Sequence, residues 1–76
     1  MGKRCLKFTF PPELVTEPVI YGLGHDFRVV TNIRRADITE DRGWVVLEME
    51  GEEENIEKGL DWVMAKGVTV EPVEEG

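Results

Sequence analysis

The sequence predicts a small α+β domain, and three observations lead to this class. Alternating apolar and polar residues indicate strands, while apolar residues spaced three and four apart indicate helices. These elements follow one another as strand, helix, strand, strand, helix, strand, and a glycine turn separates the two middle strands. Two strand–helix–strand halves joined by a hairpin are typical of the ferredoxin-like fold, in which two helices cover one face of a four-stranded antiparallel sheet.

Length and charge limit the classes of protein that this chain can belong to. Its 76 residues form one domain with a small core, and we expect order over about residues 3–73. Sixteen acidic and nine basic residues give a net charge of -7, which disfavours binding to a nucleic-acid backbone. A single cysteine excludes an intramolecular disulfide, and no apolar run is long enough to span a membrane. We therefore expect a cytoplasmic protein.

The first strand and the first helix have clear boundaries in the sequence. Residues 3–10 alternate with every second side chain apolar, and Pro11–Pro12 ends this strand because proline cannot donate to a sheet. After a loop, a helix begins with Thr16 as its cap and Pro18 in its first turn. We expect this helix to end at Gly24–His25.

The second strand is expected from Phe27 to Ile38, and it carries the first candidate binding residue. Alternation divides its side chains between the two faces of the sheet. The set expected to face the core is Phe27, Val29, Thr31 and Ile33. The opposite set is Arg28, Val30, Asn32 and Arg34. An amide such as that of Asn32 on a half-apolar face needs water or a specific partner.

The second half of the chain repeats the pattern. A turn at Asp41–Gly43 leads to a strand at residues 44–50, with Val45, Leu47 and Met49 on one face. A helix at residues 52–66 begins with acidic residues and ends at Lys66–Gly67. The last strand covers residues 68–73. Glu74–Gly76 is expected to be a solvated tail.

Two helices on one face leave the other face of the sheet uncovered. Trp44, Val46 and Val30 are expected on this open face, near Asn32. Exposed apolar patches usually mark interfaces, and most soluble oligomers are two-fold dimers. We therefore predict that the open face pairs with a second copy of the chain.

Several stretches, taken in order, resemble a known family. They are Leu6–Phe8, Pro18–Ile20, Phe27–Ile33, Gly43, Gly51, Gly59–Val63 and Gly67–Glu71. Their order and spacing resemble the NIL domain, named for an Asn-Ile-Leu motif and found at the C-terminus of bacterial methionine-import ABC transporter ATPases. The motif falls on Asn32 and Ile33, with Arg34 in place of the leucine.

The resemblance implies an ACT-like domain that pairs through its sheets and binds methionine near Asn32 as a feedback inhibitor of transport. The implied ligand contacts are Asn32, Ile33, Val30 and Arg34. The phosphate-binding loop of ATPases and the cysteine spacing of iron–sulfur proteins are both missing from the sequence, so we expect a free-standing copy of the domain. Its partners would be itself, methionine, and a transporter or sulfur-metabolism protein.

Each candidate residue also has a plain structural interpretation, and these alternatives stay open. Asn32 could be solvated or serve pairing alone. Ile33 is expected to pack into the core. Met49, Val46 and Trp44 could line a thioether pocket, but packing is the commoner role of such residues. Arg28, Arg34 and Arg35 could bind a carboxylate or phosphate, although surface ion pairs are expected.

Enzymatic and metal chemistry have little support in the sequence. Serine is absent, and no nucleophile–base arrangement is visible. Cys5 has no CxxC partner, and His25 is interpreted as a helix-end residue. Glu52–Glu54 is better explained as a helix start than as a metal site. We expect neither catalysis nor a cofactor.

Two function classes remain. The first is a regulatory domain that binds methionine or a related sulfur amino acid at a dimer interface. The alternative is an interaction subunit, without a ligand, that docks on a sulfur-metabolism or ferredoxin-type complex. RNA binding by the sheet has the same order of elements, but paired aromatic residues and a basic surface are missing.

Overall fold

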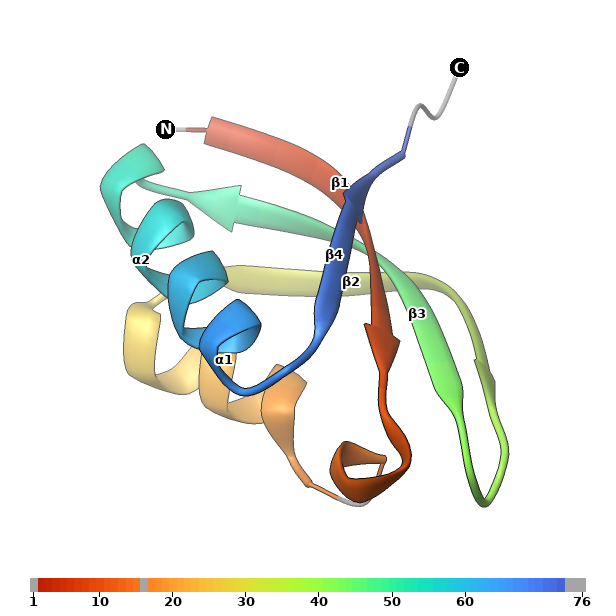
Figure 1. Cartoon of the computed structure of the whole chain (residues 1–76). Coiled ribbons are helices and arrows are strands. Elements are labelled where there is room, and N and C mark those ends of the chain that lie inside the picture. The colour runs from red at the N-terminus through yellow and green to blue at the C-terminus, as the bar shows by residue number, and fades with distance from the viewer. Residues whose placement is uncertain (1, 16, 74–76) are drawn as a thin grey trace.

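The computed structural model describes residues 2–15 and 17–73, which form two layers (Figure 1). One layer is a four-stranded antiparallel sheet in the order β2-β3-β1-β4, and the two α-helices cover one of its faces. The elements are β1 (Gly2–Phe10), the short 3-10 helix η1 (Pro12–Leu14), α1 (Val19–Phe27), β2 (Val30–Ile38), β3 (Gly43–Gly51), α2 (Glu53–Ala65) and β4 (Thr69–Pro72). The predicted ferredoxin-like class is confirmed.

The core lies between the sheet and the helices. Strands β1 and β3 contribute alternate side chains to it, and α2 contributes one apolar stripe, as their sequence patterns predict. Its fully buried members are Phe8, Leu23, Val45, Leu47, Met49, Ile56 and Val63. Because β1 and β3 are the two inner strands, their core faces are covered along most of their length.

The predicted boundary between the first helix and the second strand is wrong. Phe27 is the last residue of α1, and its ring lies 5.6 Å from the ring of Trp62 on α2. This packing carries the helix past Gly24–His25, since tertiary contacts override weak helix propensity. Arg28 then takes a left-handed conformation with φ 55°. The carbonyl oxygen of Gly24 accepts hydrogen bonds from the backbone N–H groups of Arg28 and Val29.

The predicted core face of β2 points to the helix side as expected, but it is less buried than the sequence suggested. Val29 is buried, but it precedes the strand, and the side chain of Ile33 is 55% exposed. The cause is position, because β2 is an edge strand that has a neighbour on one side only. A register shift between Ile33 and Arg35 adds a bulge at Arg34, which reverses the alternation beyond it.

The ends of the chain follow the predicted pattern with small shifts. Lys66–Gly67 ends α2 as expected: Gly67 has φ 108°, and the N–H of Val68 reaches back to the carbonyl of Val63. The loop expected before α1 contains η1. The expected cap at Thr16 and the expected tail at 74–76 lie outside the described residues. Within the described residues, no helix has the length and apolar character needed to cross a membrane.

Candidate functional site

The strand register defines which residues occupy the open face of the sheet. Val45, Leu47 and Met49 of β3 face the helices, so the alternate residues of β3 face away from them. The residues of β1 and β2 that pair with those alternate residues lie on the same, open face. The open face therefore holds Lys3, Cys5, Lys7, Thr9, Val30, Asn32, Arg35, Asp37, Trp44, Val46, Glu48 and Glu50. Trp44, Val46 and Val30 lie on the same face as Asn32, as predicted.

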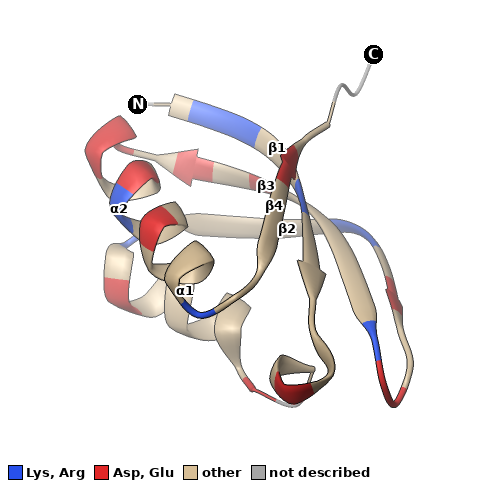
Figure 2. Ribbon diagram, in the orientation of Figure 1, with Lys and Arg blue, Asp and Glu red and all other residues tan. Residues whose placement is uncertain are grey.

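This face is not the apolar patch that the sequence suggested. Val46 is only 7% exposed, because Lys7 and Arg35 lie directly opposite it on the two neighbouring strands. Trp44 is half-buried, and the Nζ atom of Lys7 lies 5.2 Å from the centre of its ring. Of the three apolar residues expected there, only Val30 is exposed. Figure 2 shows charged residues along the strands of this sheet, with Lys and Arg positions on β1 and β2.

Asn32 lies on the exposed edge strand and pairs in register with Glu48 of β3. Its amide has no hydrogen-bond partner among residues 2–15 and 17–73. Beside it, Arg34 donates a hydrogen bond of 2.8 Å to Glu48, whose carboxylate also lies 3.7 Å from Lys3. This hydrogen bond, aided by Lys3, lowers the pKa of Glu48. Asn32 is thus a free amide next to an ion-pair cluster.

The four predicted ligand contacts do not all lie together. Val30 and Asn32 are on the open face, and the side chain of Arg34 reaches Glu48 there. Ile33 is opposite Leu47 and faces the helix side. Any ligand on the open face could contact Ile33 only through its backbone.

The three arginines considered for anion binding differ in their surroundings. Arg34 forms the expected ion pair. Arg28 and Arg35 are exposed, and neither forms an ion pair within the part of the chain that the structure describes. Arg35 is the one on the open face, opposite Val46. It therefore remains available to an anionic group.

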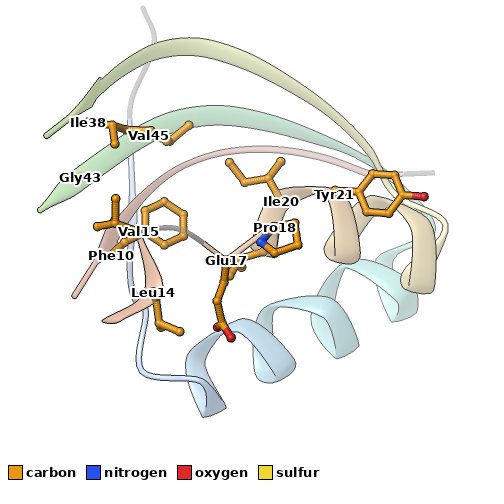
Figure 3. Close-up of a pocket in the computed structure, with 11 residues that line it drawn as sticks. Phe10, Leu14, Val15, Glu17, Pro18, Ile20, Tyr21, Ile38, Gly43 and Val45 are labelled. Carbon is orange, nitrogen blue, oxygen red and sulfur yellow. The ribbon is translucent and has the colours of Figure 1, made fainter. Parts of the chain in front are cut away.

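The structure also contains a hollow that sequence reasoning missed (Figure 3). It lies between the end of the β2–β3 hairpin, η1 and the first turn of α1, and its lining is apolar apart from Glu17. Its lining includes Phe10, Leu14, Val15, Pro18, Ile20, Tyr21, Ile38 and Val45. The pattern of β2 could have indicated Ile38, but the space between separate elements depends on their packing.

The hollow and Asn32 belong to different regions of the molecule. Ile38 faces the helix side, whereas Asn32 faces the open side. Six residues of strand separate them, which corresponds to about 20 Å. A small ligand bound to one copy of the chain cannot contact both.

The remaining candidates have structural roles. The side chain of Met49 is fully buried beneath the helices, whereas the side chains of Trp44 and Val46 are on the other face of the sheet. These three residues therefore cannot line one pocket. His25 lies in the last turn of α1, as interpreted, stacks on Tyr21 and is 3.1 Å from the carboxylate of Asp26. Among the described residues, no group of three metal-ligating side chains is close enough to hold an ion.

The fold and the open face define a ferredoxin-like domain with a polar sheet surface and a free amide on its edge strand. The family model of the NIL domain matches residues 4–72, and the chain belongs to the NIL domain family. This confirms the resemblance seen in the sequence.

Comparison with solved structures supports the fold. The C-terminal domain of an ABC transporter ATP-binding protein from Enterococcus faecalis superposes with a TM-score of 0.82 at 19% identity, over 96% of this chain and 86% of that chain. The de novo designed protein Foldit4 has a TM-score of 0.55 at 10% identity, over 97% of both chains. No curated protein matches the sequence.

Proposed function

We propose that this chain is a non-catalytic regulatory domain that binds methionine, or a related sulfur amino acid, at Asn32. Membership of the NIL family and similarity to the C-terminal domain of an ABC transporter ATP-binding protein support a regulatory role. A second copy of the chain would pair with it through the sheet. Such a role suits a cytoplasmic protein that reports on amino-acid supply to a transporter or a sulfur-metabolism protein.

The free amide of Asn32 is the observation that carries this proposal. A side-chain amide both donates and accepts hydrogen bonds, so it can contact the carboxylate or the ammonium of an amino acid. Asn32 is exposed and has no partner among the described residues, so no protein bond is broken when a ligand binds. Val30, on the same face and 67% exposed, offers an apolar surface beside it.

Regulation follows if the ligand favours one arrangement of the paired domains. A ligand shifts such an equilibrium only by the difference between its affinities for the two arrangements. A site at the edge strand is well placed for this, because a neighbouring copy can lie within reach of the same ligand. The signal would then be a change in how two copies associate.

The test is a ¹⁵N-HSQC titration with L-methionine, with D-methionine and leucine as controls. We expect saturable shifts that cluster at residues 30–34 for L-methionine. Asn32→Ala should weaken binding at least about tenfold, which corresponds to about 1.4 kcal/mol. Asn55→Ala removes an amide on α2 and should leave the affinity unchanged. Equal affinity in the Asn32→Ala and unsubstituted chains would remove Asn32 from the site.

An interaction subunit is the second candidate, and the exposed edge strand favours it. Val30, Ile33 and Ile38 are large apolar side chains exposed on β2. An unpaired edge with such side chains can add a strand from another protein. No shifts at millimolar L-methionine would favour this second role over the first.

A further inference from the structure

The hollow beside Ile38 has room for one apolar side chain. Its volume is about 130 Å³, whereas pockets for drug-sized ligands and cofactors hold roughly 300–1,000 Å³. An engineered apolar cavity of about 150 Å³ binds a benzene molecule. The hollow is therefore too small for a nucleotide or a cofactor, and it fits a group with the size of a leucine side chain.

Separate elements form the walls of this hollow, and part of its apolar rim is in contact with water. Figure 3 shows Phe10 of β1, Ile20 of α1 and Ile38 of β2 around the space. Ile38 is 56% exposed, and Tyr21, which also lines the hollow, is 70% exposed. An apolar group that covers this rim removes apolar surface from water on both sides, which favours binding.

The segments that form the hollow carry four carboxylates. Glu17 lines it directly, Glu13 is on η1, and Glu40 and Asp41 are in the turn between β2 and β3. All four are exposed, and none forms an ion pair within residues 2–15 and 17–73. Figure 2 shows the acidic positions on η1 and at the turn, where Arg42 is the neighbouring base. The surplus of negative charge favours a cationic occupant.

A second hollow adjoins the first along the start of α1. The two share Glu17, Pro18, Val19 and Tyr21, and the second is also lined by Gly22, Trp62 and Lys66. Its volume is about 200 Å³. The Nζ atom of Lys66 lies 4.9 Å from the centre of the Trp62 ring, so the positive charge here is at the end far from the β2–β3 turn. An occupant that uses both hollows must extend past Tyr21, which a peptide can do and a small amine cannot.

We propose that the two hollows form a docking site for a basic segment of a partner protein. One apolar side chain of that segment fills the hollow beside Ile38, and a neighbouring lysine or arginine lies near Glu17. The segment then passes over Tyr21 to the second hollow. Buried apolar anchors supply much of the binding free energy at protein interfaces, while charges at the rim steer association and select the partner. The site is separate from Asn32, so it does not rest on the proposed function.

The first test uses a capped pentapeptide with leucine at its centre and lysine at the other four positions. It is titrated into protein with ¹³C-labelled methyl groups, and we expect saturable shifts at Leu14, Val15, Ile20 and Ile38. Alanine at the centre should weaken binding about tenfold or more, because the buried anchor is lost. Glutamate in place of the lysines should abolish binding. Equal affinity for the alanine and leucine peptides would reduce the interaction to surface charge and overturn the proposal.

Small molecules distinguish a docking site from a ligand pocket. Isopentylamine carries an apolar group of leucine size and one ammonium group, and it should bind at least about tenfold more weakly than the leucine peptide. Equal affinity would assign the hollow to small amines and overturn the docking site. L-methionine at millimolar concentration should not displace the peptide. Displacement would assign the hollow to the amino acid and likewise overturn the proposal.

Matched variants test the two parts of the site. Ile38→Ala should weaken peptide binding about fivefold or more, whereas Ile33→Ala, on the same strand and 55% exposed but outside the hollow, should leave it unchanged. Glu17→Gln should weaken binding about threefold and reduce its dependence on salt. Glu71→Gln, on β4, removes an exposed carboxylate elsewhere and should change neither. Equal effects of Ile38→Ala and Ile33→Ala would show that the peptide does not occupy the hollow.

Discussion

The two arms of the central hairpin, β2 and β3, have the same length and opposite environments. Each has nine residues, and they pair along their length with a bulge on the β2 side. Ile33 and Leu47 are directly opposite in this ladder, yet Leu47 is fully buried while Ile33 is 55% exposed. Burial of an apolar residue therefore depends on whether its strand is inside the sheet or at its edge. The inner arm, β3, contributes to the core, whereas the outer arm, β2, has one edge that pairs with no other strand of the sheet.

The largest expected effect compares these two opposite residues. Leu47→Ala should lower the free energy of unfolding by about 2–5 kcal/mol, because it leaves a cavity in the core. Ile33→Ala should lower it by about 1 kcal/mol or less, as expected for a mostly exposed position. Urea unfolding followed by circular dichroism measures both. Dilute protein is used, so that any association between copies does not add to the effect of Ile33. Equal losses for the two variants would show that β2 is covered in the single chain.

The same comparison explains which parts of the fold could be predicted from sequence. Alternation in β1 and β3 predicted the buried side chains, since both strands are inner strands with one covered face. Alternation in β2 predicted the side of the sheet that Ile33 faces but not its exposure, because the place of β2 at the edge of the sheet is not written in the strand itself. The extension of α1 to Phe27 depends on Trp62, which lies 35 residues later in the chain.

The candidate site was predicted in a similar, partial way. The position of Asn32 on the uncovered face followed from alternation alone, and the structure agrees. Lys7 and Arg35 shield Val46 from solvent because they lie opposite it on the neighbouring strands, and this cross-strand register cannot be read from the sequence. The hollow beside Ile38 depends on the relative positions of η1, α1 and the hairpin, so no local pattern could predict it.

An intermediate effect is expected at the two helix ends that lead into the edge strands. Gly67 precedes β4 with φ 108°, and Gly67→Ala should destabilise the fold by about 1–2 kcal/mol because an L-residue is strained there. Arg28 precedes β2 with φ 55°, and Arg28→Gly should stabilise it by about 0.5–1 kcal/mol by relieving that strain. Thermal unfolding of both variants measures the contrast. Destabilisation by Arg28→Gly would show that the arginine side chain itself supports the entry into β2.

The smallest effect concerns the ion pair that joins the two arms. The hydrogen bond from Arg34, aided by Lys3, lowers the pKa of Glu48 below its ordinary value of 4.5. A carboxylate whose pKa is lower in the folded than in the unfolded chain stabilises the fold above the unfolded value. That contribution is lost as the pH falls through the lowered value.

Arg34→Gln should therefore raise the pKa of Glu48, as measured by ¹³C NMR titration of its carboxyl group. Glu48→Gln should reduce the loss of stability that occurs as the pH falls through 4.5 and below. Glu50→Gln, on the same face of β3, keeps the pair and is the matched control. Both carboxylates are at least partly exposed to solvent, so the change in stability stays small. If Arg34→Gln leaves the titration of Glu48 unchanged, Arg34 is not held by β3. The ion pair would then add little to the ladder that joins the outer arm to the inner one.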